Sequence, residues 1–84
     1  MHILVIYDVQ DDRVRLKVAN ACKDYGLQRV QFSAFKGELS NNRMQELFFR
    51  LKKTLGVDVG NIQIYPMCEK DIMLARWIEN VSFK

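Results

Sequence analysis

Asp8 is the first residue whose type and position are suited to chemistry. It follows an apolar, β-branched run at residues 3–6, so we expect its carboxylate at the carboxyl end of a buried central strand. Mg²⁺ is commonly bound by one or two carboxylates, with water and substrate phosphate completing its coordination. One Asp8 carboxylate provides few ligands for a metal ion, but a two-fold axis would bring a second Asp8 beside it. Alternatively, Asp8 helps Asp11 and Asp12 to close the turn after the strand.

Arg15, Lys17 and Arg29 are the cations placed to reach phosphates near Asp8. Arg15 and Lys17 follow Asp8 in an expected helix, and Arg29 opens the next β segment. Residues 13–53 hold ten Lys or Arg against three Asp or Glu, although the whole chain has a net charge of only +3. This asymmetry fits a surface that binds a polyanion such as nucleic acid, and it also fits helices with solvated cationic faces.

Other residue types exclude several classes of site. His2 is the one histidine, and we expect it at a strand end rather than as a metal ligand or general base. Cys22 and Cys68 form no CxxC motif, which excludes a zinc ribbon or thioredoxin-type site, so both are interpreted as small buried hydrophobes. Hydrolysis would therefore need metal-activated water attacking a phosphodiester, with Lys or Arg stabilising the developing charge.

The length and composition indicate one small domain over residues 1–84. With 84 residues, 49% of them apolar, its core is marginal, so we expect it to associate with a second subunit. The N-terminal apolar run is too short for a signal peptide or a membrane span. We therefore expect a cytoplasmic protein without a membrane partner.

The hydrophobic periodicity predicts an α+β, ferredoxin-like βαββαβ fold, with an antiparallel sheet and two helices on one face. The expected elements are a strand at 2–9 buried on both faces, a helix after the capping residues 10–12 that runs to about 25, β structure at 27–39, a helix at 42–55, and a strand at 62–66 halted by Pro66. Residues 27–39 have room for two short strands or one kinked strand. The C-terminal residues 68–84 fit a short helix near 71–79, a strand near 77–83, or an arm that orders against a partner.

The aromatic residues raise the alternatives of core packing and contact with a partner. Base stacking is considered for Tyr7, Phe32 and Phe35, but core packing is favoured for all three. Periodicity places the side chains of Met44, Phe48 and Leu51 in the core. Outside that stripe, the candidates for a subunit interface are Phe49, Trp77 and Phe83.

Three segments resemble the CRISPR-associated protein 2 family, the small ferredoxin-like subunit of the spacer-acquisition machinery. They are Ile6-Tyr7-Asp8-Val9, the segment Gly26-Leu27-Gln28-Arg29-Val30-Gln31-Phe32-Ser33-Ala34-Phe35-Lys36-Gly37-Glu38-Leu39, and Ile62-Gln63-Ile64-Tyr65-Pro66-Met67-Cys68. Together they span residues 2 to 68. The combination is specific in a chain of this length, whereas each segment alone is a weak signal.

The resemblance implies a cytoplasmic homodimer in which Asp8 of each subunit binds Mg²⁺, or Mn²⁺ in its place, and serves cleavage of phosphodiester bonds in single-stranded RNA or double-stranded DNA. It carries Arg15 and Arg29 over as site residues that bind nucleic acid, with Tyr7, Ser33 and Phe35 in support. Lys17 stands where an arginine is also found in the family. The positive charge is kept, but lysine cannot bind a phosphate in the bidentate manner of arginine.

The resemblance also implies a partner, the CRISPR integrase subunit, which this protein would brace while new spacers are inserted. A fifth strand is expected within residues 69–84, paired across the dimer or with the integrase. Two alternatives remain open: a non-catalytic, DNA-binding scaffold of the integrase complex, and a toxin-type endoribonuclease of the virulence-associated D family.

Overall fold

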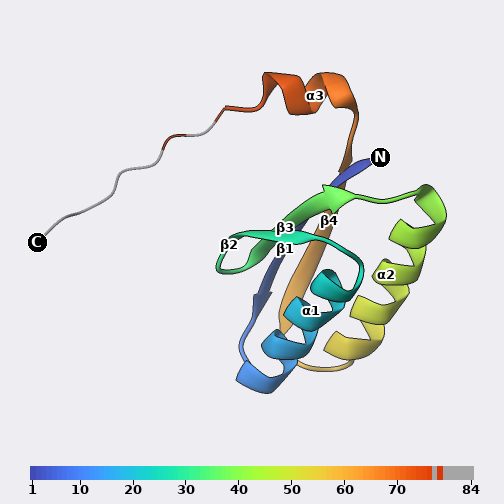
Figure 1. The fold of residues 1–84 in the computed structure, drawn as a ribbon. Helices are drawn as coiled ribbons and strands as arrows, with labels where there is room; N and C mark the ends of the chain where they lie inside the picture. Colours follow the sequence, from blue (N-terminus) through green and yellow to red (C-terminus); the bar gives the residue numbers. More distant parts are fainter. Residues whose placement is uncertain (77, 79–84) are drawn as a thin grey trace, which may run out of the picture.

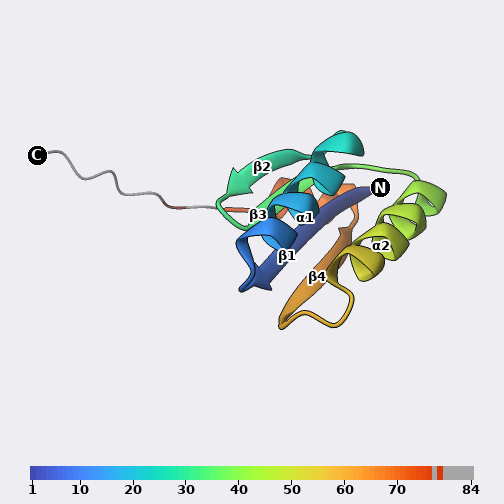
Figure 2. The same cartoon turned by 90° about the horizontal axis from the view of Figure 1, so that it is seen from below.

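A four-stranded antiparallel sheet with two long helices on one side forms the body of the protein (Figures 1 and 2). The computed structural model describes residues 1–76 and residue 78. Its elements, in chain order, are β1 (His2–Val9), α1 (Asp12–Asp24), β2 (Gln28–Gln31), β3 (Ala34–Glu38), α2 (Asn41–Leu55), β4 (Gly60–Met67) and α3 (Glu69–Leu74). The strand order β2-β3-β1-β4 places β1 at the centre. The predicted ferredoxin-like α+β fold is confirmed.

The core lies between the helices and one face of the sheet. Alternate residues of β1 (Ile3, Val5, Tyr7 and Val9) are buried against α1 and α2, as expected for the period of a strand. The residues between them lie on the other face, where Ile6 is 37% exposed. The prediction that β1 is buried on both faces was therefore wrong, because α1 and α2 both pack against the opposite face of the sheet.

Side-chain caps fix where the two long helices begin. The Asp11 carboxylate accepts hydrogen bonds from the backbone N–H groups of Arg13, at 2.8 Å, and Val14, at 3.2 Å. The hydrogen bonds from Val14 and Arg13 hold the pKa of Asp11 below its usual value. The Ser40 hydroxyl accepts from the Arg43 N–H at 3.2 Å and starts α2 in the same way. The sequence predictions for both helices are confirmed to within a residue or two.

The β structure at 27–39 resolves into two strands joined by a tight turn at Phe32 and Ser33. An irregularity between Arg29 and Gln31 shifts the β2–β3 register. The alternation expected through Val30 and Phe32 therefore breaks at the turn. Phe32 is 72% exposed, so the prediction that it packs in the core was wrong.

Two further predictions were wrong, one about the core and one about where a strand ends. Phe48 is exposed because it lies on the flank of α2 toward the β4 edge, whereas Leu47 and Leu51 face the core. Pro66 does not halt β4, since this edge strand can accommodate a proline in its ladder opposite Ile3.

The short helix expected after Cys68 is present as α3, which starts earlier than predicted and projects beyond the sheet (Figure 1). The alternative strand near 77–83 and the expected fifth strand lie mostly outside the described residues. The interface candidates Trp77 and Phe83 also lie outside them. Within the described part of the chain, no helix has the length and apolar character needed to cross a membrane.

Gly60 is expected to be intolerant of a side chain because β4 passes very close to the end of β1. Its φ is +155°, and a Cβ there would lie 2.5 Å from the Asp8 carbonyl oxygen and 3.0 Å from the Val9 Cα. Both neighbours are backbone atoms, so the strands would have to separate. We expect Gly60→Ala to lower the free energy of unfolding by about 3 kcal/mol, combining backbone strain with overpacking.

Gly26→Ala is the matched control for Gly60→Ala. Gly26 also has a positive φ, +81°, but an added Cβ would meet no atom within 4 Å. Gly26→Ala should lower the free energy of unfolding by about 1 kcal/mol, because an alanine is strained at this positive φ but meets no steric clash. Urea unfolding of both variants at equal protein concentration measures the difference, and equal losses of stability would show that the close approach at Gly60 is not tight.

Candidate functional site

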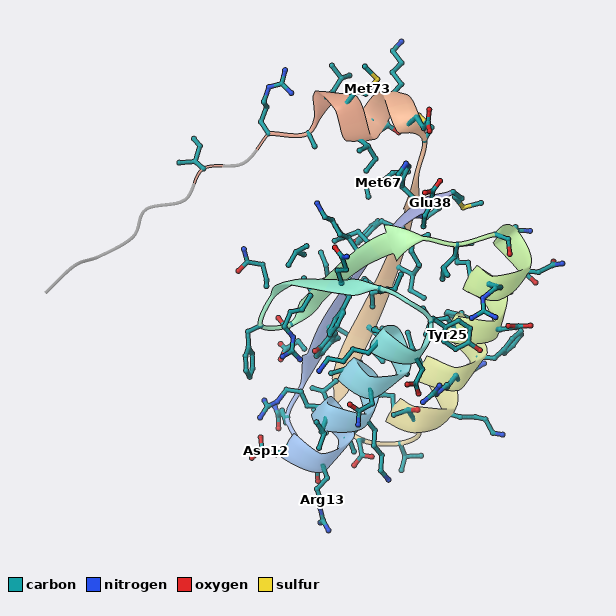
Figure 3. The ribbon with its side chains drawn as sticks, viewed as in Figure 1. Asp12, Arg13, Tyr25, Glu38, Met67 and Met73 are labelled. Atoms are coloured by element: carbon teal, nitrogen blue, oxygen red, sulfur yellow. The ribbon has the colours of Figure 1, made fainter. Side chains whose placement is uncertain are left out.

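Asp8 lies at the carboxyl end of β1, on the open sheet face. It pairs in register with Asn61 of β4, and its side chain is exposed. Asp12 and Arg13 mark this end of the molecule in Figure 3, whereas Glu38 and Met67 lie at the opposite end. The predicted position of Asp8 beside the start of α1 is confirmed.

The Asp8 carboxylate takes no part in closing the turn. Asp11 caps α1, and Asp12 forms an ion pair with Arg15. In the described part of the chain, no hydrogen bond or ion pair engages the side chain of Asp8. The turn therefore uses the other two aspartates, and the oxygens of Asp8 remain available to a ligand.

A shallow depression of about 360 Å³ surrounds Asp8. It is lined by Ile6, Tyr7, Asp8 and Val9 of β1, by Arg15 of α1, and by Phe32 and Ser33 of the β2–β3 turn. Three elements that are separate in sequence thus meet at one strand end. The depression combines a carboxylate, a guanidinium, a hydroxyl and an aromatic ring.

Arg15 is held at the rim of this depression by three contacts. Its Nη1 donates to the Val9 carbonyl oxygen at 3.3 Å, and its Nη2 pairs with the Asp12 carboxylate. The guanidinium carbon lies 5.6 Å from the centre of the Phe32 ring. Since these contacts fix a cation beside Asp8, the predicted proximity of Arg15 to the strand end is confirmed.

Tyr7 anchors the β2–β3 turn to β1. Its backbone N–H donates to the Ser33 carbonyl at 3.0 Å, and its hydroxyl donates to the Phe32 carbonyl at 3.4 Å. The Tyr7 ring is buried and stacks on Phe35, with ring centres 6.3 Å apart and planes 21° apart. Tyr7 and Phe35 are therefore core residues that position the turn, as the core interpretation predicts.

Lys17 and Arg29 do not line the depression. Lys17 lies on the exposed side of α1. Arg29 lies on the edge strand β2, where its guanidinium carbon is 5.0 Å from the centre of the buried Phe35 ring. Phe35 faces the helices, so Arg29 covers the core from the sheet edge. The structure thus brings Arg15 and Ser33 to Asp8, but it does not bring Lys17 or Arg29 there.

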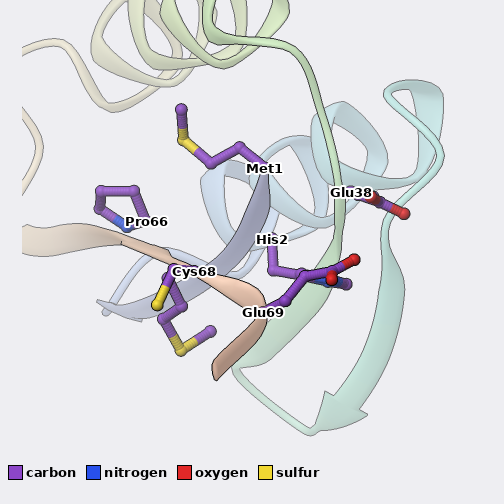
Figure 4. Close-up of a pocket in the computed structure, with 7 residues that line it drawn as sticks. Met1, His2, Glu38, Pro66, Cys68 and Glu69 are labelled. Atoms are coloured by element: carbon purple, nitrogen blue, oxygen red, sulfur yellow. The ribbon is translucent and has the colours of Figure 1, made fainter. Parts of the chain in front are cut away.

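A second depression lies at the opposite end of the sheet, around His2 and Cys68 (Figure 4). His2 is partly exposed at the start of β1, as predicted. Cys68 is exposed, so the prediction that it is a buried hydrophobe was wrong, and its thiol donates to Asp71 Oδ2 at 3.1 Å. Figure 4 shows the side chains of His2 and Cys68 directed to different sides. Over residues 1–76 and 78, no group of three His, Cys, Asp or Glu could hold a metal ion.

The two cysteines are expected to differ sharply in reactivity. Cys22 is fully buried, and burial raises the pKa of its thiol to about 11, although Arg29 and Arg50 oppose the shift. At pH 8 the Cys22 thiol is protonated and shielded, while Cys68 is open to reagent. A thiol-titration assay should find one reactive thiol per native chain and two after denaturation. With Cys68→Ser the native value should fall to zero, and rapid reaction of that variant would contradict the burial of Cys22.

Phe32 is the one residue of the depression whose exposure sequence reasoning missed. Its apolar ring and the apparent alternation with Val30 and Ala34 favoured the core. The shortness of the segment 27–39 could have indicated this exposure. Two strands within it require a tight connection near its middle, where Phe32 lies. At this connection the alternation of the strands ends, and the Phe32 side chain is exposed despite its hydrophobicity.

The chain matches the family model described as CRISPR associated protein Cas2 over residues 1–73. It is 49% identical over 79 residues to the CRISPR-associated endoribonuclease Cas2 of Desulforudis audaxviator, an alignment that covers 94% of this chain and 74% of that protein. The region that matches the family model includes Asp8 and residues 29–39.

Solved structures agree with this relationship. The crystal structure of Streptococcus pyogenes Cas2 at pH 6.5 matches with a TM-score of 0.79 and 26% identity, covering 94% of this chain and all of that one. One chain of a partial Cas6-RT-Cas1–Cas2 complex matches with a TM-score of 0.76 and 26% identity, covering 92% of this chain and 83% of that one. The family match decides against the toxin-type alternative. By its sequence and its fold, the chain belongs to the CRISPR-associated Cas2 family.

Proposed function

We propose that the protein is a homodimeric, metal-dependent endonuclease of CRISPR adaptation that cleaves phosphodiester bonds in the cytoplasm. The observation that carries the proposal is the exposed Asp8 carboxylate, which lacks a partner among the described residues and lies in one depression with Arg15. The curated relative that is 49% identical is named an endoribonuclease. Single-stranded RNA is therefore the first substrate to test, with double-stranded DNA as the second.

The residues around Asp8 fit a hard divalent cation such as Mg²⁺, with Mn²⁺ as a substitute. Carboxylate oxygens are the ligands these ions prefer, and Mg²⁺ keeps several waters when only one or two carboxylates bind it. One chain supplies Asp8 alone, since Asp11 and Asp12 have other partners. The Asp8 carboxylates of two subunits would together hold the ion. When bound, the metal supplies an activated water and positive charge for attack on the phosphodiester.

The open sheet face supports the proposed dimer. The exposed side chains of Ile6, at 37% exposure, and Tyr65, at 46%, lie on the same face as Asp8. Covering this face with a second copy would bury apolar surface that the small core leaves exposed. The same association would bring the Asp8 residues of the two chains toward each other. Dimer formation and completion of the site are therefore one event in this proposal.

The side chains of this chain have distinct parts in the proposed reaction. Asp8 binds the cation, and Arg15, already desolvated in part at the rim, stabilises the negative charge that develops on the phosphate. Lys17 and Arg29 lie outside the depression and contribute by attracting the nucleic-acid backbone. Tyr7 and Phe35 act from the core, and Ser33 offers a hydroxyl to the substrate.

A second candidate function is a DNA-binding scaffold that braces the CRISPR integrase without cutting. The match to a chain of the partial Cas6-RT-Cas1–Cas2 complex favours this candidate. The excess of Lys and Arg in residues 13–53 would serve it equally well. An integrase subunit is the proposed protein partner under both candidates.

Cleavage assays on labelled single-stranded RNA and double-stranded DNA, each with Mg²⁺, Mn²⁺ or EDTA, distinguish the two candidates. The endonuclease predicts cutting with either metal and none with EDTA. Binding of DNA without cutting under every condition would leave the scaffold as the function. Cutting that persists in EDTA would contradict the metal-dependent site.

A further inference from the structure

Phe32 is the most exposed aromatic side chain among the described residues, at 72%. A phenylalanine ring in water forfeits the burial that stabilises most such residues in a fold. Tyr7 and Phe35, the neighbouring aromatics, are almost wholly buried. Phe32 is thus set apart from the core by its place in the β2–β3 turn.

The turn that carries Phe32 is fixed rather than loosely attached. Tyr7 binds it twice, through a backbone N–H to the Ser33 carbonyl and a hydroxyl to the Phe32 carbonyl. The guanidinium of Arg15 lies over the Phe32 ring at 5.6 Å. Arg15 is in turn tied to the Val9 carbonyl and to Asp12. These contacts hold an exposed ring in a defined place at low entropic cost to a ligand.

Phe32 and Asp8 line the same depression. A phosphodiester bound by Arg15 beside Asp8 would place its adjoining nucleotide within the reach of the ring. Aromatic side chains bind single-stranded nucleic acids by stacking on bases, whose faces are open only when they are unpaired or at an end. A ring beside a phosphate site therefore favours unpaired nucleotides over the interior of a duplex.

We propose that Phe32, held by Arg15 and Tyr7, stacks on an unpaired nucleobase next to a phosphate bound by Arg15 beside Asp8, and so makes the site favour single-stranded segments. The location of the phosphate rests on the proposed function, but the stacking is independent of bond cleavage. Loss of one base–aromatic stack should weaken binding on the order of tenfold.

The test measures binding of single-stranded RNA in EDTA, where metal-dependent cleavage cannot occur. The probes carry 2-aminopurine at successive positions, because its fluorescence falls when the base stacks on an aromatic ring. We compare wild type with Phe32→Leu, which keeps an apolar side chain but removes the ring, and with Phe32→Trp, which restores one. Phe49→Leu is the matched control, since Phe49 is also exposed, at 60%, but lies on α2.

Wild type and Phe32→Trp should quench one probe position, and Phe32→Leu should lose that quenching and about tenfold in affinity. An abasic nucleotide at the same position should abolish the difference between wild type and Phe32→Leu. Equal affinity and quenching for wild type and Phe32→Leu would overturn the inference. An effect that persists with abasic RNA, or that follows dissociation of the dimer in sedimentation, would also overturn it by assigning Phe32 to another contact.

The two proposals fail in different ways in these experiments. Stacking on Phe32 without any cleavage in Mg²⁺ would support the inference and reject the endonuclease. Cleavage that depends on metal, with no contribution from Phe32 to binding, would support the endonuclease and reject the inference.

Discussion

Asp8→Asn is expected to lower the rate of metal-dependent cleavage on the order of 100-fold to 1,000-fold. The amide keeps the size of the side chain but removes the negative charge that binds the cation. Asp8 is exposed and has no partner among the described residues, so the fold should not depend on it. Cleavage of labelled RNA at saturating Mg²⁺, with urea unfolding in parallel, measures both quantities.

Glu46→Gln is the control for this change of charge. Glu46 is an exposed carboxylate on α2, and its ion pair with Arg43 is long, at 4.0 Å. Its variant should cleave at the wild-type rate. Retention of wild-type activity by Asp8→Asn would exclude Asp8 as the metal ligand. Equal losses in both variants would trace the effect to net charge instead.

Phe35→Ala is expected to lower the free energy of unfolding by about 3 to 5 kcal/mol. The ring is completely buried, stacks on Tyr7 and is covered by Arg29. The total free energy of unfolding of small domains is roughly 5 to 15 kcal/mol. The substitution would therefore remove a large part of the stability of this 84-residue chain. Circular dichroism and urea unfolding at a fixed protein concentration test this expectation.

Phe35→Leu separates packing from contact with substrate at this position. Leucine fills most of the ring's space, so this variant should remain folded and lose less than about 2 kcal/mol. Because Phe35 faces the core rather than the Asp8 depression, folded Phe35→Leu should retain cleavage. A folded Phe35→Leu protein without activity would show that the ring itself touches the substrate.

The elements that could be predicted from the sequence are those set by local signals. Asp11 and Ser40 cap the long helices through hydrogen bonds that their residue types favour, and Gly56 ends α2 with a positive φ of 54°. The apolar run of β1 required a central strand. Asp8 could be placed from this run alone, because a strand's end is determined by its own residues.

The residues that escaped prediction depend on tertiary context. Phe32 is exposed because a bulge and a tight turn change the register of β2 relative to β3, which local alternation does not reveal. Phe48 has helical spacing like that of the core residues. Its side chain stays exposed because it lies at the edge of the sheet, beside a surface depression. Pro66 fits within β4 only because the sheet order makes β4 an edge strand.

The grouping of the cationic residues also required the fold. Arg15, Lys17 and Arg29 carry the same charge, and their sequence positions could not rank their distances to Asp8. The direction of Arg15 from α1 toward the Val9 carbonyl separates it from Lys17 on the exposed side of the helix. The pairing of β2 with β3 places Arg29 over Phe35, away from the depression.

The stoichiometry of Mn²⁺ binding tests the shared Asp8 site most directly. Isothermal titration and electron paramagnetic resonance of wild type and Asp8→Asn, at a concentration where both are dimers, would count the bound ions. The proposed site predicts one Mn²⁺ for two chains in wild type and loss of that binding in the variant. One ion per chain, or unchanged binding by Asp8→Asn, would contradict a metal site formed by two Asp8 carboxylates.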